Sequence, residues 1–356
     1  MTPRTLDALR LGKWARWHNA DAFRSEVPSF AGISGGATSG MMATLLSPET
    51  VLTFQNTGRE HPRTLDFLHE LDGALGGRIV WLEFRKPKVR ASRPMHFEFA
   101  VVDYRTADRS GGPFEAFMEA LAEYRATNGD PPIEPWARSR ICTAYMKHKV
   151  ADHYIESLGV KRCDRFIGLR YDEPTRIEDL MKQSTRARQF RCPLNLAEIT
   201  KRDVREFWDA QPFKLGLLER QGNCTGCFLK DQSDLARVLG DAETDAEWWF
   251  KMEEKYPGFG GRSRPSYRQL ASEREARLAI EAALVDHRAP VNAHGLDPRR
   301  FKLVVIQERN RLKGQILPFS CSCEGSMDLA DRIDAADDAA DYRDPWETQL
   351  PLRGVA

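Results

Sequence analysis

The sequence predicts an α/β fold, with a mostly parallel sheet covered by helices on both faces. Over roughly the first two hundred residues, short apolar runs alternate with segments of helical periodicity, as is typical of strand–helix–strand units. With 356 residues, of which 41% are hydrophobic, the chain can form a large core with an appended region. In such sheets the loops that follow the strands meet at one edge, where ligands bind.

The expected elements follow one another from residue 30. A short apolar strand over 30–33 runs into a glycine and serine turn, and Met41, Met42, Leu45 and Leu46 then recur at helical spacing. Further strands are expected at 51–55, 78–84 and 165–169, and helical segments at 62–75 and 144–158. This order predicts parallel strands joined by helices.

After residue 200, helical patterns replace the strands. Thr200 is expected to cap a helix, with Asp203 in the capping-box position. Two further helices are expected within 231–256, a loop over 258–266 and a helix over 272–286. The segment 328–347 holds eight acidic and two basic residues, which predicts a solvated tail or terminal helix.

The charge balance and the start of the chain exclude several classes of protein. There are 53 Lys and Arg against 52 Asp and Glu, so the net charge of +1 gives no overall bias toward nucleic acids or membranes. No run of about 18 apolar residues is present, and the start lacks the apolar core of a secretory signal. We therefore expect a cytoplasmic protein with no membrane partner. In that compartment, seven cysteines favour metal, cluster or redox chemistry over a disulfide framework.

A glycine-rich turn, SGGATS (34–39), joins the first strand to its helix. Its two glycines let backbone N–H groups approach phosphate oxygens, and the helix that follows adds its positive end. Neither the Walker A spacing nor GxGxxG is present. Taken alone, the turn predicts either a phosphate-binding loop or an ordinary strand–turn–helix junction.

This turn and five later segments together resemble a known family. SGGATS resembles the SGGxxS PP-loop of the N-type ATP pyrophosphatases. FQNTGREHPRTLDFL resembles the segment that follows the loop in phosphoadenylyl-sulfate (PAPS) reductases and their relatives. Further matches come in the same order: RICTAYMK (140–147), GLRYDEPTRI (168–177), PLNLAEITKRDVREFW (193–208) and GNCTGCFLK (222–230). The resemblance to this PAPS-reductase-like family covers approximately residues 30–250.

The resemblance implies a Rossmann-like fold of the adenine nucleotide alpha hydrolase (HUP) type, binding ATP, or PAPS or its relative APS, with Mg²⁺. It implies that the phosphates are held by Ser34, Gly35, Gly36, Thr38 and Ser39. The nucleotide would also lie beside Asn56, Thr57 and Gly58, and Glu60 is either a ligand contact or a helix-start charge.

The resemblance also suggests how the chain is divided. We expect an N-terminal extension over 1–28 and a PP-loop adenine-nucleotide-binding α/β domain over 29–210. A helical, cysteine-bearing region over 211–327 and the acidic tail over 328–356 follow.

The loop after the 165–169 strand places two arginines around an acidic pair. The planar guanidinium of arginine suits phosphate or sulfate. In the family this loop borders the nucleotide and substrate site, so we predict that Arg170 and Arg176 bind anions in the catalytic site, with Asp172 beside them. The alternative is an ion network that stiffens the loop, formed with Asp172 and Glu173.

Cys224 and Cys227 form a CxxC, a spacing that lets two sulfurs face one metal or cluster. Cys142 lies where reductases that bind a 4Fe-4S cluster carry adjacent cysteines, and Thr143 takes the second position here. We predict a 4Fe-4S cluster whose ligands are Cys142, Cys224, Cys227 and one of Cys321 and Cys323, with Cys323 slightly favoured and Cys321 a candidate catalytic thiol. A zinc site and unliganded buried thiols are the alternatives. Cys163 and Cys192 are interpreted as ordinary thiols.

The middle of the chain is basic, with 19 Lys and Arg against 13 Asp and Glu over 134–230. Such an excess is usually a solvated face. Aromatic residues lie among the cations, so a tRNA or DNA partner is the alternative interpretation.

These motifs predict an enzyme. The favoured reaction is that of a PP-loop ATP pyrophosphatase, which with an iron–sulfur cluster adenylates or sulfur-modifies a nucleic acid or nucleotide. We also expect a sulfur or electron donor protein and a homo-oligomer. A sulfite-forming PAPS or APS reductase is the first alternative, although CSCEG (321–325) has the order Cys-Glu-Gly, not the Glu-Cys-Gly of reductases. A non-catalytic nucleotide-sensing module is the second.

Overall fold

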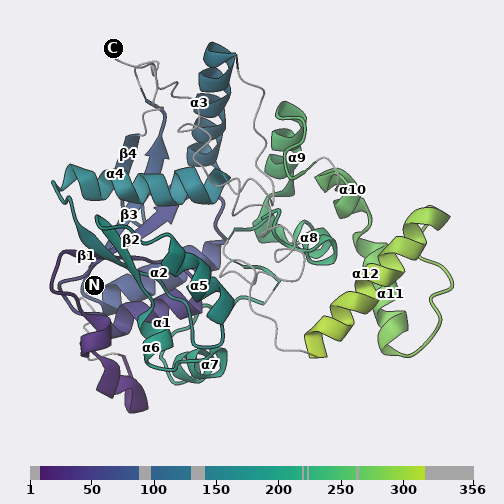
Figure 1. Ribbon diagram of the computed structural model, residues 1–356. Coiled ribbons are helices and arrows are strands. Elements are labelled where there is room, and N and C mark those ends of the chain that lie inside the picture. The colour runs from purple at the N-terminus through teal and green to yellow at the C-terminus, as the bar shows by residue number, and fades with distance from the viewer. Residues whose placement is uncertain are drawn as a thin grey trace, which may run out of the picture.

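A computed structural model describes residues 9–87, 98–129, 141–218, 220–222, 224–261 and 264–316. Its described strands form a six-stranded sheet in the order β4-β3-β2-β1-β5-β6 (Figure 1). The strands are β1 (Ser29–Gly32), β2 (Val51–Asn56), β3 (Ile79–Arg85), β4 (Glu98–Val102), β5 (Cys163–Phe166) and β6 (Arg188–Arg191). All neighbours run parallel except β3 and β4. The prediction of an α/β fold with a mostly parallel sheet is confirmed.

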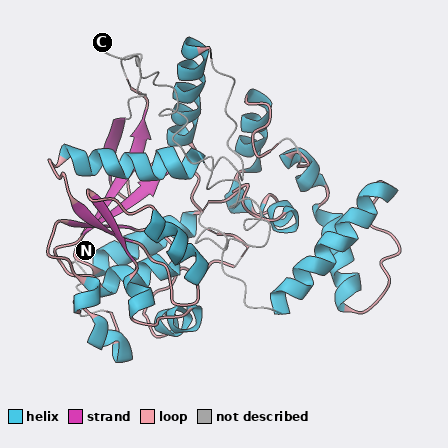
Figure 2. Ribbon diagram, viewed as in Figure 1, coloured by secondary structure: helices cyan, strands magenta, loops and turns pink. Residues whose placement is uncertain are grey.

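The helices surround the sheet and extend beyond it (Figure 2). They are α1 (Ala37–Leu45), α2 (Pro62–Ala74), α3 (Gly112–Asn128), a π-helix (Cys142–Lys149) continued by α4 (Val150–Ser157), α5 (Pro174–Lys182), α6 (Pro193–Leu196), α7 (Lys201–Asp209), α8 (Gln232–Val238), α9 (Ala246–Lys255), α10 (Tyr267–Ser272), α11 (Arg274–Val285) and α12 (Pro298–Ile316). None of these described helices has the length and apolar character needed to cross a membrane.

The strand order reverses at β1, an interior strand with neighbours on both sides. Ala31 of β1 pairs with Leu52 of β2 on one side and with Phe166 of β5 on the other. The chain builds β2 and β3 outward on the first side and then crosses to build β5 and β6 on the second. The loops after β1 and β5 therefore border the topological switch point, the place where open α/β sheets bind ligands.

One face of the sheet is covered by α1, α2 and α7. Phe54 and Trp81 from the sheet share a buried cluster with Leu68 of α2 and Phe207 of α7. The segment before β1 joins the same cluster, since the rings of Trp14 and Phe207 lie 5.5 Å apart, edge to face. Residues ahead of the predicted domain start thus contribute to its core.

The expected cap of α7 is confirmed. The Thr200 hydroxyl accepts from the Asp203 N–H, and the Asp203 carboxylate accepts from the Thr200 N–H at 3.0 Å. Helix α7 packs closely on α1, because a Cβ at Gly40 would lie 2.9 Å from the Trp208 ring. The indole Nε1 of Trp208 donates to the Ala37 carbonyl at 2.8 Å, which fixes the start of α1.

The opposite face is covered by α3, the π-helix and α4. Leu82 and Phe84 of β3 share a second buried cluster with Phe117 of α3, and this cluster continues into Trp249 of α9 and Leu270 of α10. The first part of the region after residue 210 therefore packs directly on the α/β domain. Apolar packing of this extent is the main stabilising term in folding.

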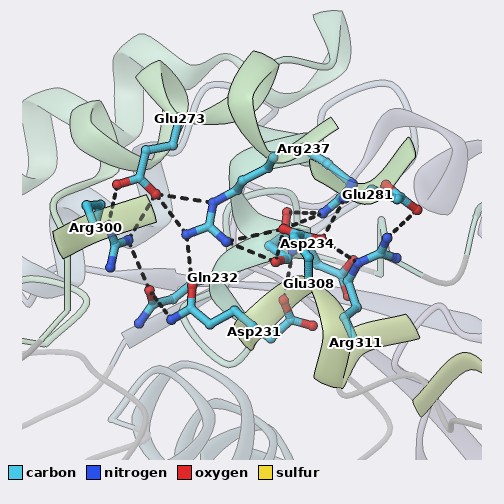
Figure 3. A network of polar contacts seen from close by, with 12 residues as sticks. Asp231, Gln232, Asp234, Arg237, Glu273, Glu281, Arg300, Glu308 and Arg311 are labelled. Atoms are coloured by element: carbon cyan, nitrogen blue, oxygen red, sulfur yellow. Dashed lines mark hydrogen bonds and ion pairs between the residues drawn. The ribbon is translucent and has the colours of Figure 1, made fainter. Parts of the chain in front are cut away.

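The last two described helices form a hairpin, α11–α12, at the end of the molecule away from the sheet (Figure 1). The hairpin is joined to α8 by a buried network of ion pairs (Figure 3). Glu308 and Arg277 are fully buried, and Glu308 accepts from Arg237 Nη2 at 2.9 Å and from Arg277 Nη1 at 3.3 Å. Buried charges of this kind are tolerated because they are paired.

Candidate functional site

The predicted PP-loop follows β1 directly, at the carboxyl end of this interior strand. The Ser39 hydroxyl lies under the loop, where it accepts from the Ser34 N–H at 3.2 Å and donates to the Gly36 carbonyl at 3.1 Å. The Ser34 hydroxyl lies 3.0 Å from it. Ser39 therefore stabilises the turn through hydrogen bonds to other residues of the loop.

Helix α1 starts at this loop without a side-chain cap. Gly36 occupies the N-cap position, whereas α7, α8 and α10 each begin with a capping hydroxyl or carboxylate. The first N–H groups of a helix have no acceptor within the helix, and the helix dipole adds positive potential there. These donors fit an anion such as the phosphates of a nucleotide.

Gly35 has the conformation that only glycine adopts easily, with φ of +82°. The loop also approaches α2 closely at this point, because a Cβ on Gly35 would lie 2.4 Å from Thr64 Cγ2. Thr64 is fully buried and so has no room to move aside. The glycine is therefore required by both backbone and packing.

The loop after β5 meets the PP-loop across the switch point. Arg170 is buried, and its Nη1 donates to the Thr38 hydroxyl at 3.2 Å. A Cβ at Gly168 would lie 3.3 Å from Ser39 Cα, so the two loops touch. A guanidinium thus lies beside the uncapped start of α1.

The same arginine belongs to an ion network. Arg170 Nε donates to Asp172 at 3.0 Å, its backbone N–H donates to Glu173 at 3.0 Å, and Arg176 Nη1 donates to Glu173 at 2.5 Å. The sequence left open whether these arginines bind an anion or stiffen the loop. The structure contains the ion network that was one of these alternatives, and the bond to Thr38 brings Arg170 beside the first turn of α1.

The segment after β2 is held by bonds within the protein. Asn56 Nδ2 donates to Glu83 at 2.7 Å and to the Asp108 carbonyl at 2.8 Å, while Asn56 Oδ1 accepts from the Gly58 N–H at 3.1 Å. Thr57 donates to Glu60 through both its N–H and its hydroxyl, at 2.9 Å each. The side chains of Asn56 and Glu60 thereby fix the backbone of the segment that follows β2.

The CxxC lies next to this segment. Thr225 donates from its N–H to the Arg59 carbonyl at 3.0 Å, and Glu60 and Cys224 form an antiparallel bridge. Arg59 itself is buried over the Trp248 ring, 4.7 Å from its centroid, and donates to the Thr244 carbonyl at 2.8 Å. The segment after β2 and the cysteine-bearing turn therefore lie side by side and form one edge of the candidate site.

Burial raises the pKa of two thiols near this segment, Cys224 and Cys142. Burial, the neighbouring Cys227 and the Glu60 carboxylate raise the pKa of Cys224 well above its usual range, and burial also raises the pKa of Cys142. The charge of Lys147, on the π-helix, opposes the increase in both thiols and in Glu60, whose pKa is likewise raised by burial. Cys142, Cys224 and Glu60 thus share the influence of one lysine.

Three of the predicted cluster ligands, Cys142, Cys224 and Cys227, lie among the described residues. The five described cysteines are free thiols, and Cys163 and Cys192 are buried. Within the described residues, no group of three or more His, Cys, Asp or Glu side chains is arranged to hold a metal ion. Cys321 and Cys323, the predicted catalytic thiol and fourth ligand, lie outside the described residues.

Several residues of this site were not singled out from the sequence. Glu83 joins Asn56 to the Asp108 loop, Arg59 joins the two halves of the edge, and Lys147 acts on both thiols. Glu83 carried a usable signal, since it is a charged residue within the apolar RIVWLEF run. The other two carried none, because their partners are distant in the sequence.

Known proteins offer limited comparison. No protein-family model matches the chain, and no solved structure matches it. The chain is similar to the "Uncharacterized nin region protein ORF290" of Escherichia phage lambda, with 23% identity over 217 residues, covering 59% of this chain and 69% of that protein. Since that name states no activity, a functional assignment depends on the site itself.

The position of Arg170 leads to a first prediction. Replacing Arg170 by lysine should weaken ATP binding about tenfold, because an ammonium cannot bond to Thr38 and Asp172 at once as the guanidinium fork does. Isothermal titration calorimetry would measure the change. Arg188→Lys is the matched control, since Arg188 pairs with Asp152 at the amino end of the parallel strands. Equal ATP affinity in the two variants would contradict a role for Arg170.

Proposed function

We propose that this protein is a PP-loop ATP pyrophosphatase of the PAPS-reductase-like family, which adenylates or sulfur-modifies a nucleic acid or nucleotide. The observation that carries the proposal is the contact between Arg170 Nη1 and the Thr38 hydroxyl, 3.2 Å across the switch point. It combines a buried guanidinium with the uncapped helix start, so the groups on both sides of the switch point favour a polyphosphate. The strand order, which reverses at β1, supports the HUP type of Rossmann-like fold.

The proposed chemistry is transfer of the adenylyl group. A substrate oxygen attacks the α-phosphorus of ATP, the bond to the β-phosphate breaks, and pyrophosphate leaves. The N–H groups at the start of α1 and the guanidinium of Arg170 would hold the phosphates in line and stabilise the charge that develops. Mg²⁺, when bound, would neutralise the charge of the departing pyrophosphate.

We further propose a thiolate site for a 4Fe-4S cluster, with zinc as the alternative, at the edge formed by Cys224 and Cys227. Cys224 and Cys227 lie two residues apart, and the charge of Cys227 contributes to the raised pKa of Cys224. A bound cation would replace the thiol protons and stabilise both thiolates. Cys142 and one of Cys321 and Cys323 complete the proposed ligand set.

The test of the function uses the full chain, purified without oxygen and incubated with ATP and Mg²⁺. Release of pyrophosphate that increases when tRNA or duplex DNA is added supports the proposal. Sulfite formation from PAPS with a thiol reductant would replace it by the reductase function. ATP binding without turnover under all these conditions would replace it by nucleotide sensing.

Absorbance near roughly 400 nm tests the cluster. Cys224→Ser should remove the absorbance together with the iron and sulfide, because one of two adjacent ligands is lost. Cys163→Ala is the control, since this buried thiol lies in β5 and should leave the spectrum unchanged. A colourless wild-type protein that holds one zinc ion would contradict the cluster and support the zinc alternative.

A further inference from the structure

Helix α12 carries two sets of cationic side chains with different surroundings. On its inner side, Arg300 Nε donates to Glu273 at 2.5 Å and Arg311 Nε donates to Glu308 at 3.0 Å. On its outer side, four cations are exposed, and no ion pair joins any of them to a described residue: Arg299, Lys302, Arg309 and Lys313. The inner charges are thus neutralised, whereas the outer charges face solvent.

The outer cations share one face of the helix. At 100° per residue, seven of the exposed positions of the helix, from Arg299 to Lys313, fall within a sector of about 120°. We define this outer face by those positions: Arg299, Lys302, Leu303, Ile306, Arg309, Asn310 and Lys313. It contains no carboxylate and spans about 21 Å along the helix axis. The nearest preceding acid, Asp297, accepts from the Arg299 N–H at 2.7 Å and so caps the helix.

The rest of the structure presents this face outward. The hairpin lies at the end of the molecule away from the sheet (Figure 1), and the ion network of Glu308, Arg277 and Arg237 fixes it on α8 (Figure 3). The apolar side of α12 is already used, since Val304 is fully buried against α11. What remains is an exposed helix face with a positive charge.

The basic stretch predicted from the sequence is a weaker candidate for a polyanion. Several of its arginines are paired with carboxylates. Arg165 Nη1 and Arg188 Nη1 each lie 2.8 Å from the carboxylate of Asp152. Arg191 Nε lies 2.5 Å from Asp164. A cation already paired with a carboxylate releases fewer counterions when it meets a phosphate. The exposed cations of α12 are therefore the stronger candidate for binding a polyanion.

We propose that the outer face of α12 binds duplex DNA by lying in its major groove. The proposal rests on the proposed function for its choice of a nucleic acid and identifies that partner more closely. A helix of 10–12 Å diameter fits the groove, which is about 12 Å wide. Within it, the four cations contact phosphates, Asn310 reaches adenine edges, and Leu303 and Ile306 contact thymine methyl groups.

The composition of the face argues against a membrane surface. An interfacial helix buries a broad apolar side in the lipid, rich in large apolar residues. The outer face offers only two aliphatic side chains, Leu303 at 44% exposure and Ile306 at 52%. Charge rather than apolar area dominates, as in nucleic-acid-binding surfaces.

The experiment compares two double variants of the full chain by fluorescence anisotropy, with a labelled DNA duplex of about 25 base pairs at a series of salt concentrations. Lys302→Ala/Arg309→Ala removes two outer-face cations. Lys13→Ala/Lys255→Ala removes the same charge from cations that are paired elsewhere, with Glu206 and Glu119. The first variant should bind at least about tenfold more weakly, with a salt slope smaller by about two, while the control binds as the wild type does.

Two further measurements use the same proteins. An RNA duplex of the same sequence should bind more weakly than DNA, because its major groove is too narrow for a helix. Equal DNA affinity in both double variants, equal affinity for the two duplexes, or binding to anionic phospholipid vesicles in place of DNA would each overturn the proposal. ATP turnover is measured separately: a chain that binds DNA through α12 but releases no pyrophosphate retains this inference and loses the proposed function.

Discussion

Gly35→Ala should abolish nucleotide binding while leaving the fold in place. The new Cβ would lie 2.4 Å from Thr64 Cγ2, on a residue whose φ is +82°. Left-handed backbone costs about 1–2 kcal/mol for alanine, and overpacking a buried site costs about 1–3 kcal/mol. The loop must move to relieve both, and its N–H groups then no longer converge on one anion. We expect ATP affinity to fall at least about a hundredfold, since each displaced bond to a charged group contributes about 1.5–3 kcal/mol.

Two variants separate the causes of this loss. Gly73→Ala is the matched control, because Gly73 lies within α2 and a Cβ there would meet no atom within 4 Å. It should keep full affinity and gain about 0.5–1 kcal/mol of stability. Adding Thr64→Ser to Gly35→Ala removes the clashing methyl group but not the backbone strain, so binding should return in part. Normal ATP affinity in Gly35→Ala would show that the loop does not hold phosphate.

Replacing Glu308 by leucine should destabilise the protein by about 3–5 kcal/mol, the usual result of removing one partner from a buried ion network. The change leaves Arg277, which is fully buried, and Arg237 without their shared carboxylate (Figure 3). Urea unfolding followed by circular dichroism would measure it, and hydrogen exchange should locate the loss in α8, α11 and α12. Glu275→Leu is the control, because Glu275 lies on the exposed side of α11 at 72% exposure and should change stability by under about 0.5 kcal/mol.

The contribution of Glu308 to the free energy of unfolding should decrease as the pH falls. Burial alone would raise the pKa of Glu308, but hydrogen bonds from Arg237 and Ser233 and the charge of Arg237 bring the pKa below its usual value. A carboxyl with a lowered pKa stabilises the fold above its unfolded pKa and loses that effect as the pH falls. The difference in stability between wild type and Glu308→Leu should therefore narrow below about pH 4. A difference that stays constant from pH 7 to pH 3 would contradict this account.

Much of the fold could be predicted because local pattern and tertiary structure agree. The runs at 51–55 and 78–84 became β2 and β3 within one residue at each end, and the Thr200 cap formed as expected. No element was assigned to 98–102 or 188–191, which became β4 and β6. Strand β6 (RQFR) is a short edge strand with an arginine at each end, so its apolar content does not mark it. Strand β4 (EFAVV) is apolar in four of its five residues and carried a usable signal.

The contacts of the candidate site were less accessible to sequence reasoning. The PP-loop and CxxC are local motifs, whereas the bond from Arg170 to Thr38 joins residues 132 positions apart. The position of Arg59 over Trp248 depends on how α9 packs, which no local pattern encodes. The sequence of α12 does not distinguish its exposed cations from Arg300 and Arg311, because the carboxylates that pair with these two arginines are identified only by the structure.

Strand β6 determines how copies of this molecule can meet. It ends the sheet on one side, is four residues long and begins and ends with arginine. Arg188 and Arg191 are tied to Asp152 and Asp164 of the same chain, so charged side chains flank the open hydrogen-bonding edge. Short, charged edge strands resist pairing with a second sheet. Continuous sheets and amyloid-like stacking are therefore disfavoured along this side, so a homo-oligomer is not expected to form by pairing of β6 strands.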